Sequence, residues 1–453
     1  MQVIRANNRM TAGERIDALL DPGSAVEYGS IAAQIPETGE WVPESGGIDF
    51  VGTIDGQVVL TSSTDYSDHG GGYGAGQLTH LFALAEEHRW PLVFFVDGGG
   101  SRARHPRAGL GHREIGGAIG RFSLFDGISE LSGWVPTIAI VSGPSYAGHA
   151  SLAAFSDFLI ATRGSSIGMG GPPMVEAALG KRMTPQELAP VEMHDVKGGI
   201  DLLVDDEPAA IAAAKRYLAF YRDAPAGEPA PGADQIHTLV PDDGLYDMRP
   251  VIDAIVDHGS RFELRPNFAR SVITTLARLD GRSVGVLANQ PLVAEGAIDE
   301  NAATKIARFV EICNAYEYPI ISLIDTPGFV TRWDATDDDP GTTEPGMGRA
   351  HARTLMAHHH RTVPLFSIQL RQAGRLGAFA MSGYGNGRSV PILRAAWPLV
   401  RLHDRDGFSA FDHANAFDDI IEPAETRPRI SGVLRHIQRT LTRTQKKHPI
   451  DTW

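Results

Sequence analysis

Short apolar runs alternate with helical patterns along most of this chain. Residues 91–96 and 137–141 are apolar and partly β-branched, which is typical of strands buried on both faces. Apolar positions at helical spacing fill residues 77–88, and a further helix is expected near residues 116–132. The same order of strands and helices returns at residues 284–288, 304–316, 320–324, 348–358 and 365–369. This alternation predicts an α/β fold with parallel strands.

The N-terminal part adds a capped helix and a hairpin. Thr11, followed three residues later by Glu14, predicts a capping box at the start of a helix over residues 10–20. Residues 47–54 and 58–63 are expected to form two strands, joined by a turn at Asp55-Gly56.

One stretch of sequence occurs twice, 228 positions apart. The sequence WPLVFFVD at residues 90–97 is matched by YPIISLID at residues 318–325, and VPTIAI at residues 135–140 is matched by VPLFSI at residues 363–368. A fixed offset over such a span indicates an internal duplication. Between the copies, residues 223–234 are rich in proline, glycine and alanine, as linkers are. The sequence therefore predicts two domains, residues 1–230 and 231–453.

Composition excludes several classes of function. The chain has 453 residues and a formal net charge of −14, which argues against a nucleic-acid partner. Its one cysteine, Cys313, excludes a disulfide framework and a four-cysteine zinc site. The start of the sequence carries no apolar leader and no apolar run reaches membrane-spanning length, so we expect a cytoplasmic protein without a membrane partner.

A group of histidines near the end of the second repeat raises the question of a metal. The residues are His351, His358, His359 and His360. Consecutive side chains on a helix point to different faces, so a common metal ion is not expected there. No metal site is predicted for this chain.

Glycine-rich segments follow the predicted strands in both repeats. Residues 98–100 and 143–150 follow the first two strands, and residues 327–329 and 374–379 follow their counterparts. Loops after the carboxyl ends of parallel strands hold the ligands in α/β folds. Small residues at the start of a helix let backbone N–H groups approach a ligand oxygen, and two such groups form an oxyanion hole. The sequence thus predicts one oxygen-binding loop in each repeat.

The motifs in these loops resemble a known family. Residues 143–158 read GPSYAGHASLAAFSDF, and the second repeat carries NQP at residues 289–291, KIARF at 305–309, DTPGF at 325–329, and GAF at 377–379 after Arg371. Over residues 10–440 the chain resembles the carboxyltransferase (beta) subunit of biotin-dependent acyl-CoA carboxylases, of the acetyl-/propionyl-CoA carboxylase and transcarboxylase type. The resemblance implies two crotonase-like ββα-spiral domains. The first would bind acyl-CoA and the second carboxybiotin. The active site would be shared between subunits of a homo-oligomer, usually a hexamer.

The resemblance also implies which residues do the chemistry. By position, the amides of Ala147 and Gly148 would hold the acyl-CoA thioester oxygen, and those of Gly377 and Ala378 the ureido oxygen of biotin. Further substrate-binding positions would be Gly98, Gly99, Gly100, Arg102 and Phe379. No methionine is followed by lysine, so the usual attachment site of biotin is missing. Biotin is expected on a partner, a biotin carboxylase or biotin carrier subunit.

Two departures from the family pattern keep other functions open. The chain has Ala147-Gly148-His149 where the family carries Gly-Gly-Ala, and Leu376 where it carries the first glycine of Gly-Gly-Ala-Tyr. His149 is interpreted either as a histidine satisfied by a backbone carbonyl or as an acid or base near neutral pH. The alternatives are a biotin-independent acyl-CoA decarboxylase or hydrolase that uses His149, and a catalytically silent subunit of a carboxylase assembly.

Overall fold

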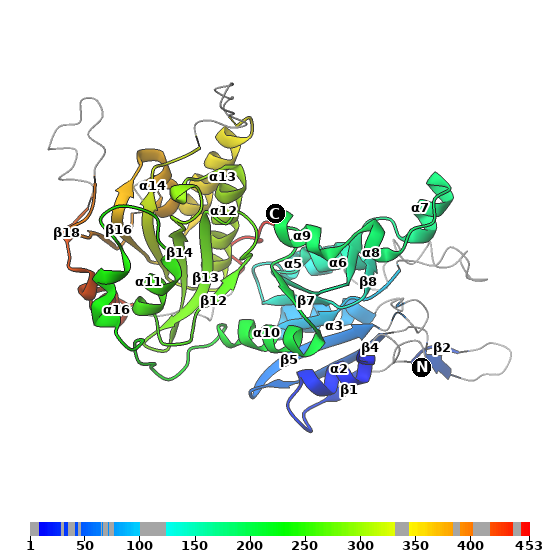
Figure 1. Ribbon diagram of the computed structural model, residues 1–453. Helices are drawn as coiled ribbons and strands as arrows, with labels where there is room; N and C mark the ends of the chain where they lie inside the picture. Colours follow the sequence, from blue (N-terminus) through cyan, green and yellow to red (C-terminus); the bar gives the residue numbers. More distant parts are fainter. Residues whose placement is uncertain are drawn as a thin grey trace. The chain divides into compact units, whose positions relative to one another are not determined.

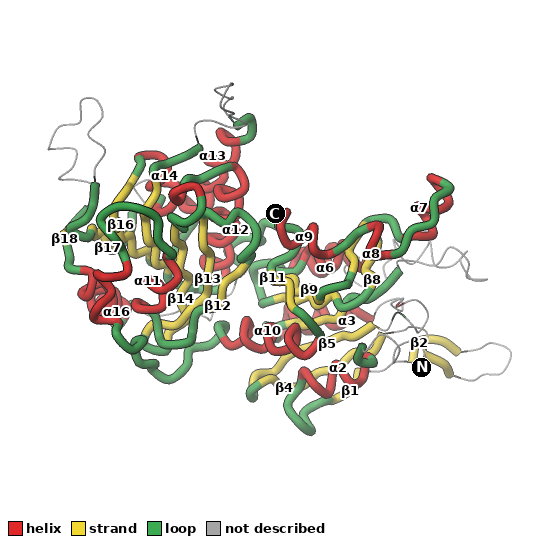
Figure 2. The backbone as a smooth tube through the Cα atoms, in the orientation of Figure 1, coloured by secondary structure: helices red, strands yellow, loops and turns green. Residues whose placement is uncertain are grey.

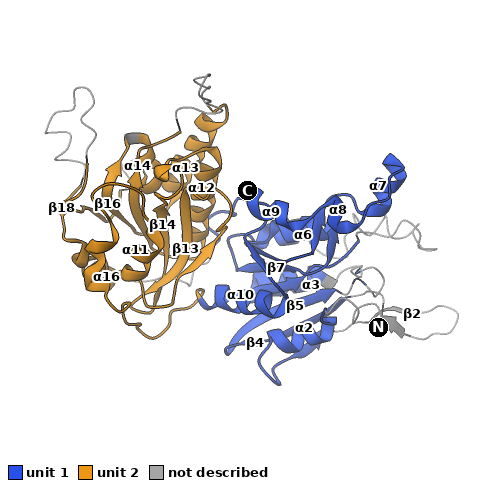
Figure 3. Cartoon of the chain, viewed as in Figure 1, with its two compact units in different colours: residues 1–219, 446–452 blue, residues 220–445, 453 orange. Residues whose placement is uncertain are grey.

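The computed structural model describes residues 9–28, 31–34, 41–43, 47–64, 66, 71, 77–99, 124–330, 344–383, 390–401, 417–437 and 445–453. The chain divides into two compact units (Figure 3). The first comprises residues 1–219 with 446–452, and the second comprises residues 220–445 with 453. The proline-rich segment 223–234 lies at the start of the second unit, and the C-terminal segment from residue 446 belongs to the first.

The first unit is built on a sheet of seven strands (Figures 1 and 2). Their order is β1 (Val26–Tyr28), β4 (Gly47–Ile54), β5 (Gln57–Thr64), β6 (Leu92–Phe95), β7 (Thr137–Val141), β9 (Phe158–Thr162) and β11 (Leu202–Val204). The pairs β1–β4 and β4–β5 are antiparallel, and the pairs from β5 to β11 are parallel. The helices are α2 (Ala12–Leu19), α3 (Gln77–His88), α5 (Leu124–Leu131), α6 (Gly148–Phe155), α7 (Pro172–Leu179), α8 (Pro185–Leu188), α9 (Val191–Lys197) and α10 (Glu207–Ala219). Two small sheets pair β8 (Pro144–Tyr146) with β10 (Ser166–Gly168), and β2 (Ile31–Gln34) with β3 (Trp41–Pro43).

The second unit repeats this plan. Its seven-stranded sheet runs β12 (Phe262–Leu264), β13 (Val272–Leu279), β14 (Arg282–Asn289), β15 (Ile320–Thr326), β16 (Leu365–Ala373), β17 (Leu393–Ala396) and β18 (Asp419–Ile420). Again two antiparallel pairs are followed by parallel ones. The helices are α11 (Met248–Ile255), α12 (Glu300–Ala315), α13 (Met347–His360), α14 (Arg375–Ser382) and α16 (Thr426–Leu434), with 3-10 turns η2 (Ala233–Leu239), η3 (Ala294–Gly296) and η5 (Pro423–Glu425).

The duplication extends to the strand register. In the first unit Leu60 pairs with Leu92, and Leu92 pairs with Thr137. In the second unit Gly285 pairs with Ile320, which pairs with Leu365. Because strands with buried faces cannot slip by one residue without exposing their apolar side chains, an identical register places the strand ends of both units alike. The internal duplication and the α/β class predicted from the sequence are both confirmed.

Local sequence explains the elements that frame the site. The Thr11 hydroxyl accepts a hydrogen bond from the Glu14 amide at 3.2 Å, and the Glu14 carboxylate accepts one from the Thr11 amide at 2.8 Å, so the predicted capping box is confirmed. Strands β6, β7 and β15 are buried along their whole length, which is why their sequences are mostly apolar. Apolar side chains of α3 and α5 complete the core of the first unit.

Candidate active site

The loop after β6 and the loop after β7 lie against each other in the first unit. The amide of Gly98 donates to the Pro144 carbonyl at 2.8 Å, and the amide of Tyr146 donates to the Gly98 carbonyl at 2.9 Å. Gly98 and the exposed Gly99 are therefore held beside the strand β8 that leads into α6. Two other predicted positions, Gly100 and Arg102, lie outside the described residues.

The start of α6 presents one backbone donor. The amide of Ala147 donates to the Gly168 carbonyl at 3.1 Å, so it is engaged within the protein. The amide of Gly148, at the first position of the helix, donates to no described residue. A Cβ atom added to Gly148 would meet nothing within 4 Å. Of the pair predicted from the sequence, Gly148 is thus the residue whose amide donates to no described residue and whose Cα atom has open space on its Cβ side.

His149 is buried next to this helix start. Its side chain is 5% exposed, and Nε2 lies 2.7 Å from the Gly71 carbonyl. A Cβ atom on Gly98 would lie 2.3 Å from the same nitrogen, so the imidazole rests directly on the Gly98 backbone. Burial lowers the pKa of His149, and Nε2 donates to the Gly71 carbonyl. This is the arrangement of a histidine satisfied by a backbone carbonyl.

The second unit has a corresponding loop at the start of α14. The amide of Gly374 donates to the Thr326 carbonyl at 2.9 Å, and the amide of Ala378 makes the first turn of the helix by donating to the Gly374 carbonyl at 2.7 Å. Of the predicted pair, Gly377 is the residue whose amide donates to no described residue. A Cβ atom on Gly377 would lie 2.6 Å from the Gly328 Cα atom, so glycine is needed for this contact. Phe379 is half-buried on the same helix.

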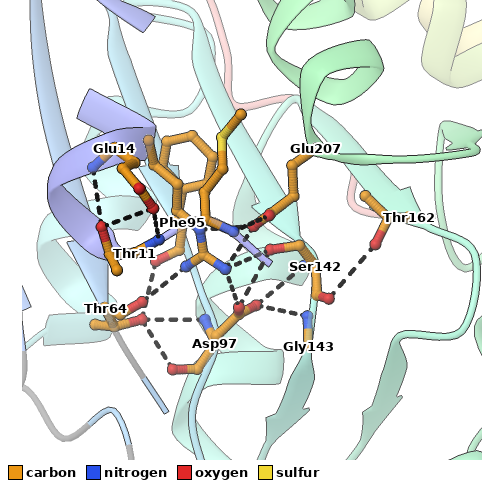
Figure 4. Close-up of polar contacts among 11 residues, drawn as sticks. Thr11, Glu14, Thr64, Phe95, Asp97, Ser142, Gly143, Thr162 and Glu207 are labelled. Atoms are coloured by element: carbon orange, nitrogen blue, oxygen red, sulfur yellow. Dashed lines mark hydrogen bonds and ion pairs between the residues drawn. The ribbon is translucent and has the colours of Figure 1, made fainter. Parts of the chain in front are cut away.

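A buried polar cluster ties the strand ends of the first unit together (Figure 4). The Asp97 carboxylate accepts hydrogen bonds from the amides of Ser142 and Gly143, at 3.0 and 2.9 Å. Arg15 donates to Asp97 at 2.7 Å and to Glu207 at 2.7 Å. Because both carboxylates are buried, the Arg15 guanidinium supplies the charge that makes their burial tolerable.

Asp325 occupies the matching place in the second unit. Its carboxylate accepts hydrogen bonds from Arg371 Nε at 2.9 Å, the Tyr246 hydroxyl at 2.7 Å and the Gln372 amide at 3.1 Å. Burial, together with the Asp325 carboxylate, raises the pKa of Tyr246. The repeat in the sequence contains both aspartates, but it predicts no role for them and gives no indication of Arg15 or Tyr246. The sequence feature that could have indicated a role for these aspartates is their occurrence at the same position of both repeats, at the end of an apolar run.

The second unit also holds a pocket of about 380 Å³ near the carboxyl ends of β14 and β16. It is lined by Asp243, Gly244, Leu245, Pro291, Glu295, Arg371, Gln372 and Arg401. Two of these residues, Arg371 and Gln372, are the partners of Asp325, so the same carboxylate shapes one wall of the pocket.

One of the α13 histidines has a structural contact in the part of the chain that the structure describes. His358 is buried and its Nε2 lies 3.0 Å from the Ala380 carbonyl of α14. Burial lowers its pKa to about 3, so the ring is neutral and acts as a donor. Across the described ranges, no three His, Cys, Asp or Glu side chains are grouped as metal ligands.

None of the described helices is long and apolar enough to cross a membrane.

Comparisons with known proteins agree with this geometry. The profile of the carboxyl transferase domain matches residues 4–402. The methylmalonyl-CoA carboxyltransferase 12S subunit of Propionibacterium freudenreichii subsp. shermanii is 31% identical over 98% of this chain and 91% of its own length. The methylmalonyl-CoA decarboxylase subunit alpha of Veillonella parvula is 29% identical over 98% of this chain and 93% of its own.

A solved structure matches the whole chain. It is a transcarboxylase 12S hexamer with hydrolysed methylmalonyl-CoA bound, which aligns with a TM-score of 0.83 at 30% identity and covers 99% of this chain and 93% of its own. The match confirms the fold that the sequence motifs imply, two tandem crotonase-like domains.

Proposed function

The chain belongs to the carboxyl transferase family, and we propose that it moves a carboxyl group between carboxybiotin and the α-carbon of an acyl-CoA thioester. As a member of this family it is an acyl-CoA carboxyltransferase. The observation that carries the proposal within the molecule is the Gly148 amide, which lies at the first position of helix α6 and donates to no described residue. In the second unit the Gly377 amide, which also donates to no described residue, has the corresponding role in the proposal.

The chain's part in the reaction is to hold oxygen atoms that gain negative charge. Loss of the α-proton moves charge onto the thioester oxygen, and a fixed N–H group aimed at that oxygen lowers the barrier by about 3 kcal/mol. We assign this role to Gly148 in the first unit, with Gly98 and Gly99 forming the adjoining wall. Carboxybiotin supplies the carboxyl group, and we assign its ureido oxygen to Gly377, with Phe379 beside it.

Biotin and the oligomer are further parts of the proposal. Biotin would arrive on a separate carrier or biotin carboxylase subunit, and the chain would form a hexamer like the transcarboxylase 12S structure. Helix α7, which projects from the first unit in Figure 1, supports self-association because none of its residues is buried. On this helix the side chain of Met174 is 66% exposed and that of Leu179 is 73% exposed. A second copy of the chain could cover such apolar side chains. Sedimentation velocity of the purified chain measures the assembly.

Replacement of His149 separates this function from the biotin-independent alternative. If His149 only supports Gly98 and Gly71, His149→Ala lowers stability but leaves carboxyl transfer largely intact. If His149 transfers protons, the same change lowers kcat by about 100-fold or more. The measurement is the rate of methylmalonyl-CoA turnover with and without free biotin. Turnover that needs no biotin and disappears in His149→Ala would support the alternative. A folded chain without turnover that still binds a carboxylase partner would support a silent subunit.

A further inference from the structure

A buried aspartate stands at the same place in both repeats. Asp97 follows β6 and Asp325 lies near the end of β15, 228 positions later, and their side chains are almost fully buried. The backbone amide of each is bound by a side chain at the end of the preceding strand. Thr64 Oγ1 accepts from the Asp97 amide at 3.0 Å, and Asn289 Oδ1 accepts from the Asp325 amide at 3.2 Å. Different residue types therefore keep the same contact.

The carboxylates also bind corresponding atoms. Asp97 accepts the Ser142 amide after β7, and Asp325 accepts the Gln372 amide of β16, so each carboxylate links two neighbouring strand ends. Each is paired with an arginine, but Arg15 comes from α2 whereas Arg371 comes from β16. We call each aspartate with these contacts an aspartate brace. The arginine of the brace comes from a different element in each repeat. The two repeats have therefore kept the geometry around the aspartate while their sequences diverged.

Each brace leads directly into the oxygen-binding loop of its unit. The residue after each aspartate accepts a hydrogen bond from the other loop: Tyr146 donates to Gly98 and Gly374 donates to Thr326. Both partners of this bond are again 228 positions apart. The free amides of Gly148 and Gly377 follow within three residues of these donors. Each brace therefore fixes the two loops of its unit at the point where they approach the ligand.

We infer that Asp97 and Asp325 are positioning residues for the reaction, and that each serves the substrate held by its own repeat. This inference rests on the proposed function, which assigns acyl-CoA to the first unit and biotin to the second. Loss of one carboxylate loosens one pair of loops and leaves the other pair in place. Because a displacement of about 1 Å at a reacting centre can reduce the rate 100-fold, a looser loop affects one substrate selectively.

The two braces differ in what remains when the carboxylate is removed. Arg15 keeps Glu207 as a partner at 2.7 Å. Arg371, in the described part of the chain, has Asp325 as its carboxylate and otherwise binds the carbonyls of Pro241 and Gly244. A buried guanidinium without a counter-charge is strongly destabilising. Asp325→Asn is therefore expected to lower stability more than Asp97→Asn does.

The test compares Asp97→Asn and Asp325→Asn in the full-length chain. We expect Asp97→Asn to raise KM for methylmalonyl-CoA at least about tenfold with KM for free biotin unchanged, and Asp325→Asn to do the reverse. Asp157→Asn and Asp257→Asn are the matched controls. Asp157 is equally buried but accepts the Thr137 amide at the opposite end of β7. Asp257 pairs with Arg427 at the β13–β14 turn. Both controls should lower stability without separating the two KM values.

A binding measurement keeps the inference independent of turnover. Titration calorimetry with methylmalonyl-CoA should show weaker binding by Asp97→Asn and wild-type binding by Asp325→Asn. Where an aspartate variant fails to fold, Ser142→Ala and Tyr246→Phe each remove one hydrogen bond to the same carboxylates. Equal effects on both substrates, or unchanged affinity in a folded Asp97→Asn, would overturn the inference. A wild-type chain that neither binds methylmalonyl-CoA nor uses biotin would instead overturn the proposed function.

Discussion

Ala147 is held in a backbone conformation that glycine adopts far more easily. Its φ is 52° and its ψ is −121°, directly before the free amide of Gly148. Strain of this kind costs about 1–3 kcal/mol and is retained where surrounding structure demands it. The family pattern has glycine at this position, so the alanine lowers the free energy of unfolding of this chain.

Ala147→Gly should therefore stabilise the protein. Relief of the positive φ is expected to raise the free energy of unfolding by about 1 kcal/mol, since it outweighs the extra freedom of glycine in the unfolded chain. Ala154→Gly, at an exposed position of the same helix, is the control and should cost about 1 kcal/mol. Urea unfolding curves measure both. A loss of stability in both variants would show that Ala147 is not strained.

Gly148→Ala should separate folding from function. Apart from the chain neighbours of Gly148 and the backbone of its own helix, no described atom lies within 4 Å of the added methyl group, so the fold is expected to tolerate it. If a thioester oxygen approaches this amide, the methyl group blocks it, and kcat/KM for the acyl-CoA substrate should fall at least about tenfold. Gly432→Ala in α16 is the control, because a Cβ there also meets nothing within 4 Å. Unchanged kinetics in folded Gly148→Ala would contradict the assignment.

Asp49 gives a pH dependence with a definite sign. Burial raises its pKa from an ordinary value of 3.8 to about 6, although Ser62 and His80 act in the opposite direction. Between about pH 4 and 6 the folded chain keeps a proton that the unfolded chain releases, so this group lowers stability as pH rises through that window. Above pH 6 the cost is about 2–3 kcal/mol.

The variant Asp49→Asn tests this dependence. It should be more stable than the wild type at pH 8, and the difference should reach its minimum below about pH 3, where Asp49 is almost fully protonated in both states. Chemical denaturation at several pH values measures the difference. A difference that does not change with pH would mean that Asp49 is not buried as a charged group.

At the scale of elements, the two hairpins have the same turn, but the space around the turn glycine differs between them. The turns Asp55-Gly56 and Asp280-Gly281 are 225 positions apart, and all four residues have positive φ. A Cβ atom on Gly56 would meet nothing within 4 Å, whereas one on Gly281 would lie 2.2 Å from the Ala224 carbonyl oxygen. Gly56→Ala should cost about 1 kcal/mol through φ strain alone. Gly281→Ala should cost clearly more. Equal losses in thermal unfolding would contradict this account.

The sequence predicted those elements whose own residues show a clear apolar pattern. The helix at residues 77–88 and the strand at residues 137–141 have the predicted bounds. The helix expected near residues 116–132 is seen as α5, although its first part lies outside the described residues. Strand β13 was not predicted. It is buried, but it carries the polar residues Thr274, Thr275 and Arg278. The Thr274 hydroxyl donates to the Leu264 carbonyl of β12, and the Arg278 amide donates to the Ser260 hydroxyl, so these partners lie outside the strand.

The positions of the site loops could be predicted from the sequence, but the bonding of their amides could not. Glycines after strand ends are visible in the sequence, so Gly148 and Gly377 could be selected. Which of these amides donates to another described residue depends on contacts that the loop sequences do not specify. Ala147 is engaged by Gly168, and Ala378 closes the first turn of its own helix. Arg15 reaches Asp97 from 82 positions away, and no local pattern predicts such a pairing.

At the scale of the whole molecule, duplication supplies two equivalent sheets with equivalent loops in one chain. The strand register, the hairpin turn and the aspartate brace are retained in both copies, while the side chains that follow Gly148 and Gly377 differ, with His149 in one helix and Phe379 in the other. A reaction with two substrates, each with an oxygen to be held, fits this combination of shared framework and divergent surface.

The most direct test of this account is the transfer of a labelled carboxyl group. The purified chain is incubated with methylmalonyl-CoA that carries ¹⁴C in its free carboxyl group, with and without free biotin. The account predicts that label appears on biotin, and that decarboxylated acyl-CoA forms only when biotin is present. Release of labelled CO₂ at the same rate without biotin, or no turnover by a folded chain, would contradict it.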